Sequence, residues 1–214
     1  MPKMTLHIVN ARHQLSGVVN WLSERLEDAF AVSARYLPLL DTDVILRAGK
    51  AVIQEKGHLG YAPERGLIYV TVDPENPALR ANPSQSLERM LAHELHHSSR
   101  WDGPGYGKTL GEALVSEGLA GHFAQEAYGG EREPWEQLSA ITLRSYFLKA
   151  QADWQSADYN HGEWFFGSQV FPAWVGYSLG YELVGRYLAA HGDARASNLV
   201  HADAADFRAL LDAV

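Results

Sequence analysis

His93-Glu94-Leu95-His96-His97 is the stretch of the sequence that decides the fold. In an α-helix, residues four positions apart lie on one face, about 6 Å apart, so His93 and His97 project side by side. Two imidazoles at that spacing can bind one zinc ion, and Glu94 lies on the flank of the same face. This is the HExxH pattern, in which the glutamate serves as a general base. The competing interpretation is a surface helix with a solvated, His-rich face.

The residues around the motif predict a helix. Asn82 can cap it, Pro83 has the backbone angle of a first helical position, and Gln85 can complete a capping box. Five residues then recur at helical spacing and are predicted to share the buried face of the helix: Leu87, Met90, Leu91, Glu94 and Leu95. A carboxylate on an otherwise apolar face is costly unless it has a partner. A nearby dication would supply that partner for Glu94.

A second helix is predicted downstream of the motif. A stretch rich in glycine and proline, residues 103–107, ends the first helix, and Thr109-Leu110-Gly111-Glu112 forms a capping box. The new helix runs from about Leu110 to Tyr128 and ends at Gly129-Gly130.

Glu117 is the candidate third ligand on this second helix. It shares one stripe with Leu110, Leu114 and Gly121, so it also faces inward. Small residues at 118, 120 and 121 would let this helix approach the motif helix closely. Two His and one Glu make a three-ligand set, and the open fourth position is what distinguishes a catalytic zinc from a structural one.

The sequence here resembles the gluzincin metallopeptidases, in which HExxH is followed by a ligand Glu about twenty residues later on the next helix. Glu117 lies twenty residues after His97, and Ser116-Glu117-Gly118-Leu119-Ala120 is similar to the segment around that ligand. More narrowly, the chain resembles a bacterial family of uncharacterised predicted zinc-dependent proteases with HELxH and EGLA motifs and a late Gly-Tyr segment. The resemblance covers most of the chain and implies a zincin-like fold with one zinc ion per chain.

One position departs from the resemblance. Thermolysin-like members carry an Asp four residues after the Glu ligand, where it orients a ligand histidine. Here that position is Gly121, so the partner that would orient His93 is unassigned.

Composition narrows the possible functions. The formal net charge is −8 and no basic cluster occurs, which argues against nucleic-acid binding. There is no cysteine, so nothing points to an oxidising compartment. No apolar run resembles a signal peptide or reaches transmembrane length. We therefore expect a cytoplasmic protein with no membrane partner, and the oligomeric state is not indicated.

The order of elements predicts an α+β fold. Strands are expected at Thr5–Val9, Asp43–Arg47 and Leu67–Val72, with a turn and a short strand over 56–61, a loop at 62–66 and a helix over Val18–Leu37. Later helices are expected at 133–154 and 172–190, around an irregular aromatic segment at 157–171. We interpret residues 1–214 as a single zincin-like catalytic domain: an upper lobe of about 1–100 with the sheet and the HExxH helix, and a lower helical lobe of about 101–214.

The strand Leu67–Val72 is the last before the motif helix. In metallopeptidases of this resemblance that strand forms the lip of the cleft, where a substrate adds as another strand. The alternative is an interior strand with no free edge.

Aromatic residues are concentrated late in the chain: 12 of the 23 fall between Tyr146 and Tyr187. A tetrahedral intermediate is usually met by a positioned hydrogen-bond donor. Tyr177 is the first candidate for that donor, followed by Tyr181 and then His161. Gly176 and Gly180 beside the tyrosines would permit close approach to another element. The alternative is that both tyrosine rings only fill the core.

The expected function is that of a zinc-dependent peptidase acting on peptides or proteins. Zinc held by His93, His97 and Glu117 would activate water, with Glu94 as general base. The alternative from another class is a pseudopeptidase, a zinc-stabilised binding or regulatory module. Hydrolysis of a non-peptide amide is a third option.

Overall fold

The structure is a computed structural model that describes residues 2–211. It divides into two compact units. The first contains the chain up to Asp102 together with Ala127–Gly130, and the second contains Gly103–Glu126 and the chain from Glu131 onward.

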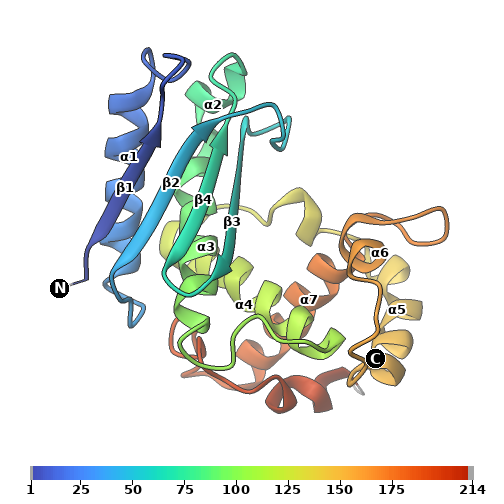
Figure 1. The fold of residues 1–214 in the computed structure, drawn as a ribbon. Coiled ribbons are helices and arrows are strands. Elements are labelled where there is room, and N and C mark those ends of the chain that lie inside the picture. The colour runs from blue at the N-terminus through green and yellow to red at the C-terminus, as the bar shows by residue number, and fades with distance from the viewer. Residues whose placement is uncertain (1, 212–214) are drawn as a thin grey trace. The chain divides into compact units, whose positions relative to one another are not determined.

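The first unit is built on a four-stranded sheet. Its strands are β1 (Met4–Val9), β2 (Thr42–Ala48), β3 (His58–Glu64) and β4 (Leu67–Val72), arranged in the order β1-β2-β4-β3. The β1–β2 and β2–β4 pairs are parallel, whereas β3 runs antiparallel to β4. Figure 1 shows β3 at one edge of the sheet.

Two helices of this unit, α1 (Val19–Ser33) and α3 (Ser86–Arg100), pack against one face of the sheet and against each other (Figure 1). The buried residues of α1 lie on one face of the helix: Leu22, Leu26, Ala29, Phe30 and Ser33. On β2, buried residues alternate with exposed or partly buried ones, as expected for a strand covered on one side. The short helix α2 (Pro77–Ala81) and the 3₁₀ turn η1 (Pro83–Gln85) lead into α3.

The motif helix starts later than predicted. Asn82 adopts left-handed backbone angles, and its side-chain oxygen accepts a hydrogen bond from the backbone N–H of Leu87 at 2.9 Å. Gln85 is also left-handed and makes no side-chain cap, so the predicted capping box is wrong. Asn82 still satisfies a donor of the first turn, but from five residues away because η1 lies between.

The sheet order corrects the predicted substrate strand. β4 lies between β2 and β3, so both of its edges are occupied by ladder hydrogen bonds. Its interior position was the stated alternative. Strand β3 extends through Pro63, where a loop was predicted, and the register shifts between Tyr61 and Glu64. A proline is tolerated there because an edge strand does not need every ladder donor.

The second unit is built from α-helices and 3₁₀ helices. They are α4 (Leu110–Tyr128), η2 (Pro134–Glu136), α5 (Ala140–Asp153), α6 (His161–Phe166), α7 (Val175–Ala190) and η3 (Ala204–Leu211). The predicted capping box of α4 is present, since Glu112 accepts from the Thr109 N–H and Thr109 Oγ1 accepts from the Glu112 N–H. The helix predicted over 133–154 is broken into η2 and α5, and α6 lies inside the segment predicted to be irregular.

Glycines let α7 cross α4 closely. A Cβ at Gly180 would collide with the Leu114 carbonyl of α4, and one at Gly118 would collide with the Gly180 backbone of α7. The predicted role of Gly180 is therefore confirmed. Gly118 serves the same α4–α7 contact, because the atoms nearest to a Cβ at this position belong to Gly180 and Val184 of α7.

The α+β prediction, a small N-terminal sheet followed by helices, is confirmed. Among the described residues, no helix has the length and apolarity that a membrane crossing requires.

His58 joins the edge strand to the start of the motif helix. Its Nε2 shares a 2.9 Å hydrogen bond with Ser86 Oγ, and only 3% of its surface is exposed. Burial lowers the pKa of His58 to about 3, with the Lys56 charge as a smaller cause. A neutral imidazole therefore stays buried at any pH near neutrality.

We predict an acid-dependent loss of stability from His58. Its folded pKa lies below the usual value of 6.5, so the unfolded chain binds one more proton between pH 6.5 and 3. The stability that this group contributes is complete above pH 6.5 and falls by about 1.4 kcal/mol for each pH unit below it. Denaturant unfolding at several pH values should show a shallower dependence for His58→Gln. An exposed control, His13→Asn, should follow the unsubstituted protein, and equal slopes for all three would contradict the assignment.

Candidate metal centre

The two histidines of the motif meet on one face of α3. His93 Nε2 and His97 Nε2 lie 3.0 Å apart, and the ring centroids are 4.7 Å apart at an interplanar angle of 78°. Two histidine nitrogens bound to one tetrahedral zinc ion would be separated by about 3.3 Å, given Zn–N bonds of about 2.05 Å. The pair is therefore close to the spacing that such an ion requires. His97 is buried and His93 is partly buried.

Glu94 lies on the buried side of the motif helix, as predicted, with 9% of its surface exposed. Strand β3 approaches it at Gly60. A Cβ on Gly60 would lie 2.5 Å from Glu94 Cγ and 2.9 Å from Glu94 Oε1, and it would also collide with Met90. Only glycine lets the strand come this close to the carboxylate.

The backbone N–H and C=O of Gly60 point to the outer edge of the sheet and not toward β4. In an antiparallel pair, alternate residues bond to the partner strand and face outward. The Gly57 carbonyl, on the inner side, accepts from the N–H of Asp73, which follows β4. On the outer side, the His58 carbonyl accepts from the Ile53 N–H and the Ala62 carbonyl accepts from Trp101 Nε1. This alternation puts the N–H and C=O of Gly60 on the outer side of β3. Among the described residues, β3 has no second neighbouring strand.

The far end of α3 is also tied to the β3–β4 hairpin. Trp101 donates its indole N–H to the Ala62 carbonyl at 3.2 Å. Arg65, in the turn after β3, reaches the Trp101 carbonyl at 3.0 Å and Asp102 at 2.7 Å. Together with the His58–Ser86 bond, these contacts fix the edge strand along the motif helix.

Glu117, the predicted third ligand, lies in the second unit near the middle of α4. It is 8% exposed, so it faces inward as predicted. The hydroxyl of Tyr106 donates a hydrogen bond to Glu117 Oε1 at 2.9 Å. Sequence reasoning missed Tyr106, because the glycine-rich stretch around it was interpreted only as a helix breaker.

A cluster of polar rings continues from Tyr106. The Tyr106 ring meets the His161 ring edge-on at 5.9 Å, and His161 Nδ1 shares a 3.1 Å hydrogen bond with the Tyr159 hydroxyl. Burial raises the pKa of Tyr106 well above its usual value and that of Tyr159 to about 12, and Glu117 adds to both shifts. Burial lowers the pKa of His161. These groups are therefore neutral near pH 7 and act as hydrogen-bonding groups without charge.

The two candidate tyrosines of α7 have different environments. Tyr177 is partly buried, with its ring edge-on to Phe165 at 5.0 Å and near Phe166 at 6.5 Å. Tyr181 is 2% exposed, its ring stacks on His122 at 3.8 Å, and its hydroxyl donates to Gln125. Tyr181 is therefore a core residue, and its place as second choice for the donor is wrong.

Gly121 has a structural explanation. A Cβ at this position would collide with Glu136 Oε1 and lie 3.1 Å from Tyr181. Glu136 is a buried residue of η2, and its Oε2 accepts from the Glu133 N–H at 2.9 Å. The space that an aspartate side chain would enter from α4 is therefore already occupied by a carboxylate from η2.

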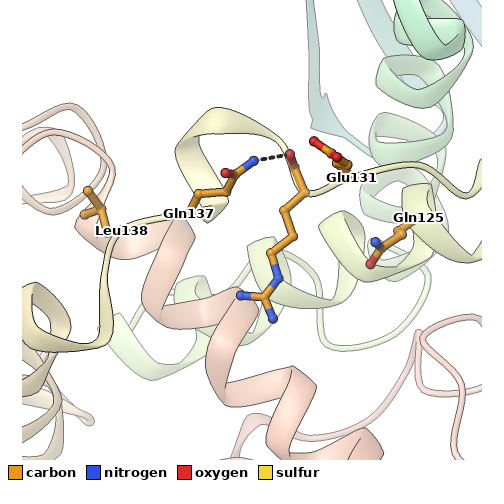
Figure 2. Close-up of a pocket in the computed structure, with 5 residues that line it drawn as sticks. Gln125, Glu131, Gln137 and Leu138 are labelled. Atoms are coloured by element: carbon orange, nitrogen blue, oxygen red, sulfur yellow. Dashed lines mark hydrogen bonds between the residues drawn. The ribbon is translucent and has the colours of Figure 1, made fainter.

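A polar pocket of about 490 Å³ also opens on the second unit, lined by Gln125, Glu131, Arg132, Gln137 and Leu138. Figure 2 shows the Gln137 amide donating to the Arg132 carbonyl at its wall. None of the candidate ligands lines this pocket.

Comparison with known proteins now identifies the family. Residues 22–209 match the family described as "Predicted Zn-dependent protease (DUF2268)". The chain belongs to this family. It is also 30% identical over 153 residues to the uncharacterised protein YjfC of Bacillus subtilis, an alignment that covers 64% of this chain and 50% of the relative. The chain thus spans about half the length of that curated relative.

Proposed function

We propose that the protein is a zinc-dependent peptidase of the gluzincin type, with one zinc ion bound by His93, His97 and Glu117. The observation that carries the proposal is the pair of Nε2 atoms 3.0 Å apart on the helix whose Glu94 lies beside the edge strand. The family description supports the choice of zinc and of proteolysis.

The third ligand is supported by three properties of Glu117. It is twenty residues from His97, it is inward-facing, and its carboxylate is held by a tyrosine hydroxyl. Histidine nitrogens and a carboxylate oxygen form a donor set typical of catalytic zinc, which keeps one position open. A structural site would need a fourth protein ligand.

The chemistry divides between the metal and Glu94. When bound, a zinc ion supplies the Lewis acidity that polarises the scissile carbonyl and lowers the pKa of water. The Glu94 carboxylate takes the proton from the attacking water and transfers it to the leaving amine nitrogen. Its buried position beside Gly60 keeps the carboxylate fixed for both transfers.

We expect metal binding and hydrolysis to separate by residue. Alanine at His93, His97 or Glu117 should abolish stoichiometric zinc, measured by elemental analysis after dialysis. Glu94→Gln should retain zinc and lose at least about 100-fold in kcat on peptides, because a general base is not a ligand. Profiling the zinc-replete protein on a peptide library supplies the substrate for this assay.

Undiminished zinc in Glu117→Ala would remove Glu117 from the ligand set. If the zinc-replete protein cleaves no peptide and Glu94→Gln preserves its cellular phenotype, the protein is instead a zinc-stabilised binding module.

We further propose that a peptide substrate adds to β3 as an additional strand. Gly60 lies beside Glu94, and its N–H and C=O point to the outer edge of β3, so a peptide paired there would pass near the general base in extended form. Leu59 and Tyr61, on either side, are exposed and could contact substrate side chains. This proposal replaces β4 by β3 as the substrate strand.

Strand addition predicts sensitivity to the substrate backbone. In the best peptide from the library, replacing the amide that pairs with Gly60 by an ester removes one hydrogen-bond donor. We expect KM to rise about five- to tenfold at one position, and much less at the adjacent position, whose N–H faces the other way. A uniform response along the peptide would contradict strand addition.

Tyr177 remains our proposed donor to the oxyanion of the tetrahedral intermediate. It is a partly buried tyrosine at the start of α7, in the same unit as Glu117, and its charge would act on Tyr106. Tyr177→Phe removes only the hydroxyl, so kcat should fall by about 100-fold while zinc content is unchanged. The matched control is Tyr181→Phe, which should leave kcat within a few fold. An unaltered kcat in Tyr177→Phe would return this residue to a packing role.

A further inference from the structure

The hydrogen bond between Tyr106 and Glu117 links a loop residue to a proposed ligand. The Tyr106 hydroxyl can only donate to an ionised carboxylate, and the 2.9 Å distance to Glu117 Oε1 is that of an ordinary hydrogen bond. The bond engages one carboxylate oxygen of Glu117 and restricts rotation of the group.

The loop that carries Tyr106 has a defined backbone. Gly105 and Gly107, on either side of Tyr106, have φ angles of +73° and +95°, which are accessible to glycine at little cost. A Cβ at Gly107 would collide with the Glu112 side chain. The tyrosine is therefore held between two turns that other residues would strain.

The same loop is anchored to the helix of Glu117. The Glu112 carboxylate accepts from the Lys108 N–H at 2.8 Å, the Thr109 N–H at 2.8 Å and Thr109 Oγ1 at 3.0 Å. Glu112 lies in the first turn of α4, five residues before Glu117. Loop and ligand therefore share one rigid frame, and the position of the Tyr106 hydroxyl is fixed relative to Glu117.

We propose that Tyr106 is a positioning residue that holds the Glu117 carboxylate in the orientation for metal binding. This inference rests on the proposed function, in which Glu117 is a zinc ligand. Hydrogen-bond partners of ligating carboxylates orient them, and removing such a partner typically lowers metal affinity about 10- to 100-fold. The Tyr106 hydroxyl bonds to the proposed ligand carboxylate, so its effect should be on metal binding first.

The chain provides a matched control for this proposal. Tyr159 belongs to the same ring cluster, is also partly buried and also makes one side-chain hydrogen bond, but its hydroxyl bonds to His161. Tyr106→Phe and Tyr159→Phe therefore each remove one hydroxyl from the same environment. Only the first removes a hydroxyl that is hydrogen-bonded to Glu117.

The experiment measures zinc affinity of the full chain by competition with a chromophoric chelator. Tyr106→Phe should bind zinc about 10- to 100-fold more weakly, whereas Tyr159→Phe should bind within about threefold of the unsubstituted protein. The visible spectrum of the cobalt(II)-substituted protein should change in Tyr106→Phe and not in Tyr159→Phe, because it reports ligand geometry. Equal zinc affinity of Tyr106→Phe and the unsubstituted protein would overturn the proposal.

A double-mutant cycle separates positioning from a general loss of structure. With Glu117→Ala already present, Tyr106→Phe should cause no further loss of the weak zinc affinity that the two histidines retain, because the group that it positions is gone. Additive losses would mean that Tyr106 acts through the fold, and the proposal would be wrong. If Glu117→Ala alone binds zinc like the unsubstituted protein, both the ligand assignment and the role of Tyr106 fail. If only Tyr106→Phe is without effect, the proposed function stands.

Discussion

The close approach of β3 to the motif helix at Gly60 is the contact on which the first unit depends. A buried carboxylate needs a defined environment, and Glu94 lies on the sheet-facing side of α3 within reach of the strand. The rest of the unit maintains this contact at both ends: His58 bonds Ser86 at the start of α3, and Trp101 bonds Ala62 beyond its end. The edge strand β3 is thereby held against α3 at the start of the helix, at Glu94 and beyond the end of the helix.

In the second unit, Glu117 is positioned by the close packing of the α4 and α7 backbones. Gly118 and Gly180 let α7 pack on α4 with no side chain between them, directly beside Glu117, the proposed ligand. Because Gly118 follows Glu117 in the helix, the packing contact with α7 lies next to the residue for which we propose metal binding. The loop before α4 then returns through Tyr106 to the carboxylate, so the helix is constrained from two sides.

The sequence predicted what depends on local pattern. The strand Leu67–Val72, the helix Leu110–Tyr128 and its capping box, and the inward direction of Glu94 and Glu117 all follow from periodicity within one element. It could not predict which strand lies at the edge, because strand order is set by pairing between distant residues. Tyr106 had a recognisable signal, an aromatic residue between two glycines just before a helix cap, but its partner lies eleven residues away and requires the loop geometry.

At position 121, the space that a side chain of α4 would occupy is filled by the carboxylate of another element. By the spacing of the motif that the sequence resembles, position 121 is where thermolysin-like members carry an aspartate, and glycine supplies no carboxylate there. In the fold, Glu136 brings its Oε1 to the point where a side chain at 121 would begin, and the Glu133–Glu136 capping box fixes η2 around it. An aspartate added at 121 would place two carboxylates in one buried space, which costs several kcal/mol unless one is protonated or paired. Glycine is thus required at position 121 because the Glu136 side chain occupies the adjacent space. The carboxylate beside this turn of α4 therefore comes from Glu136.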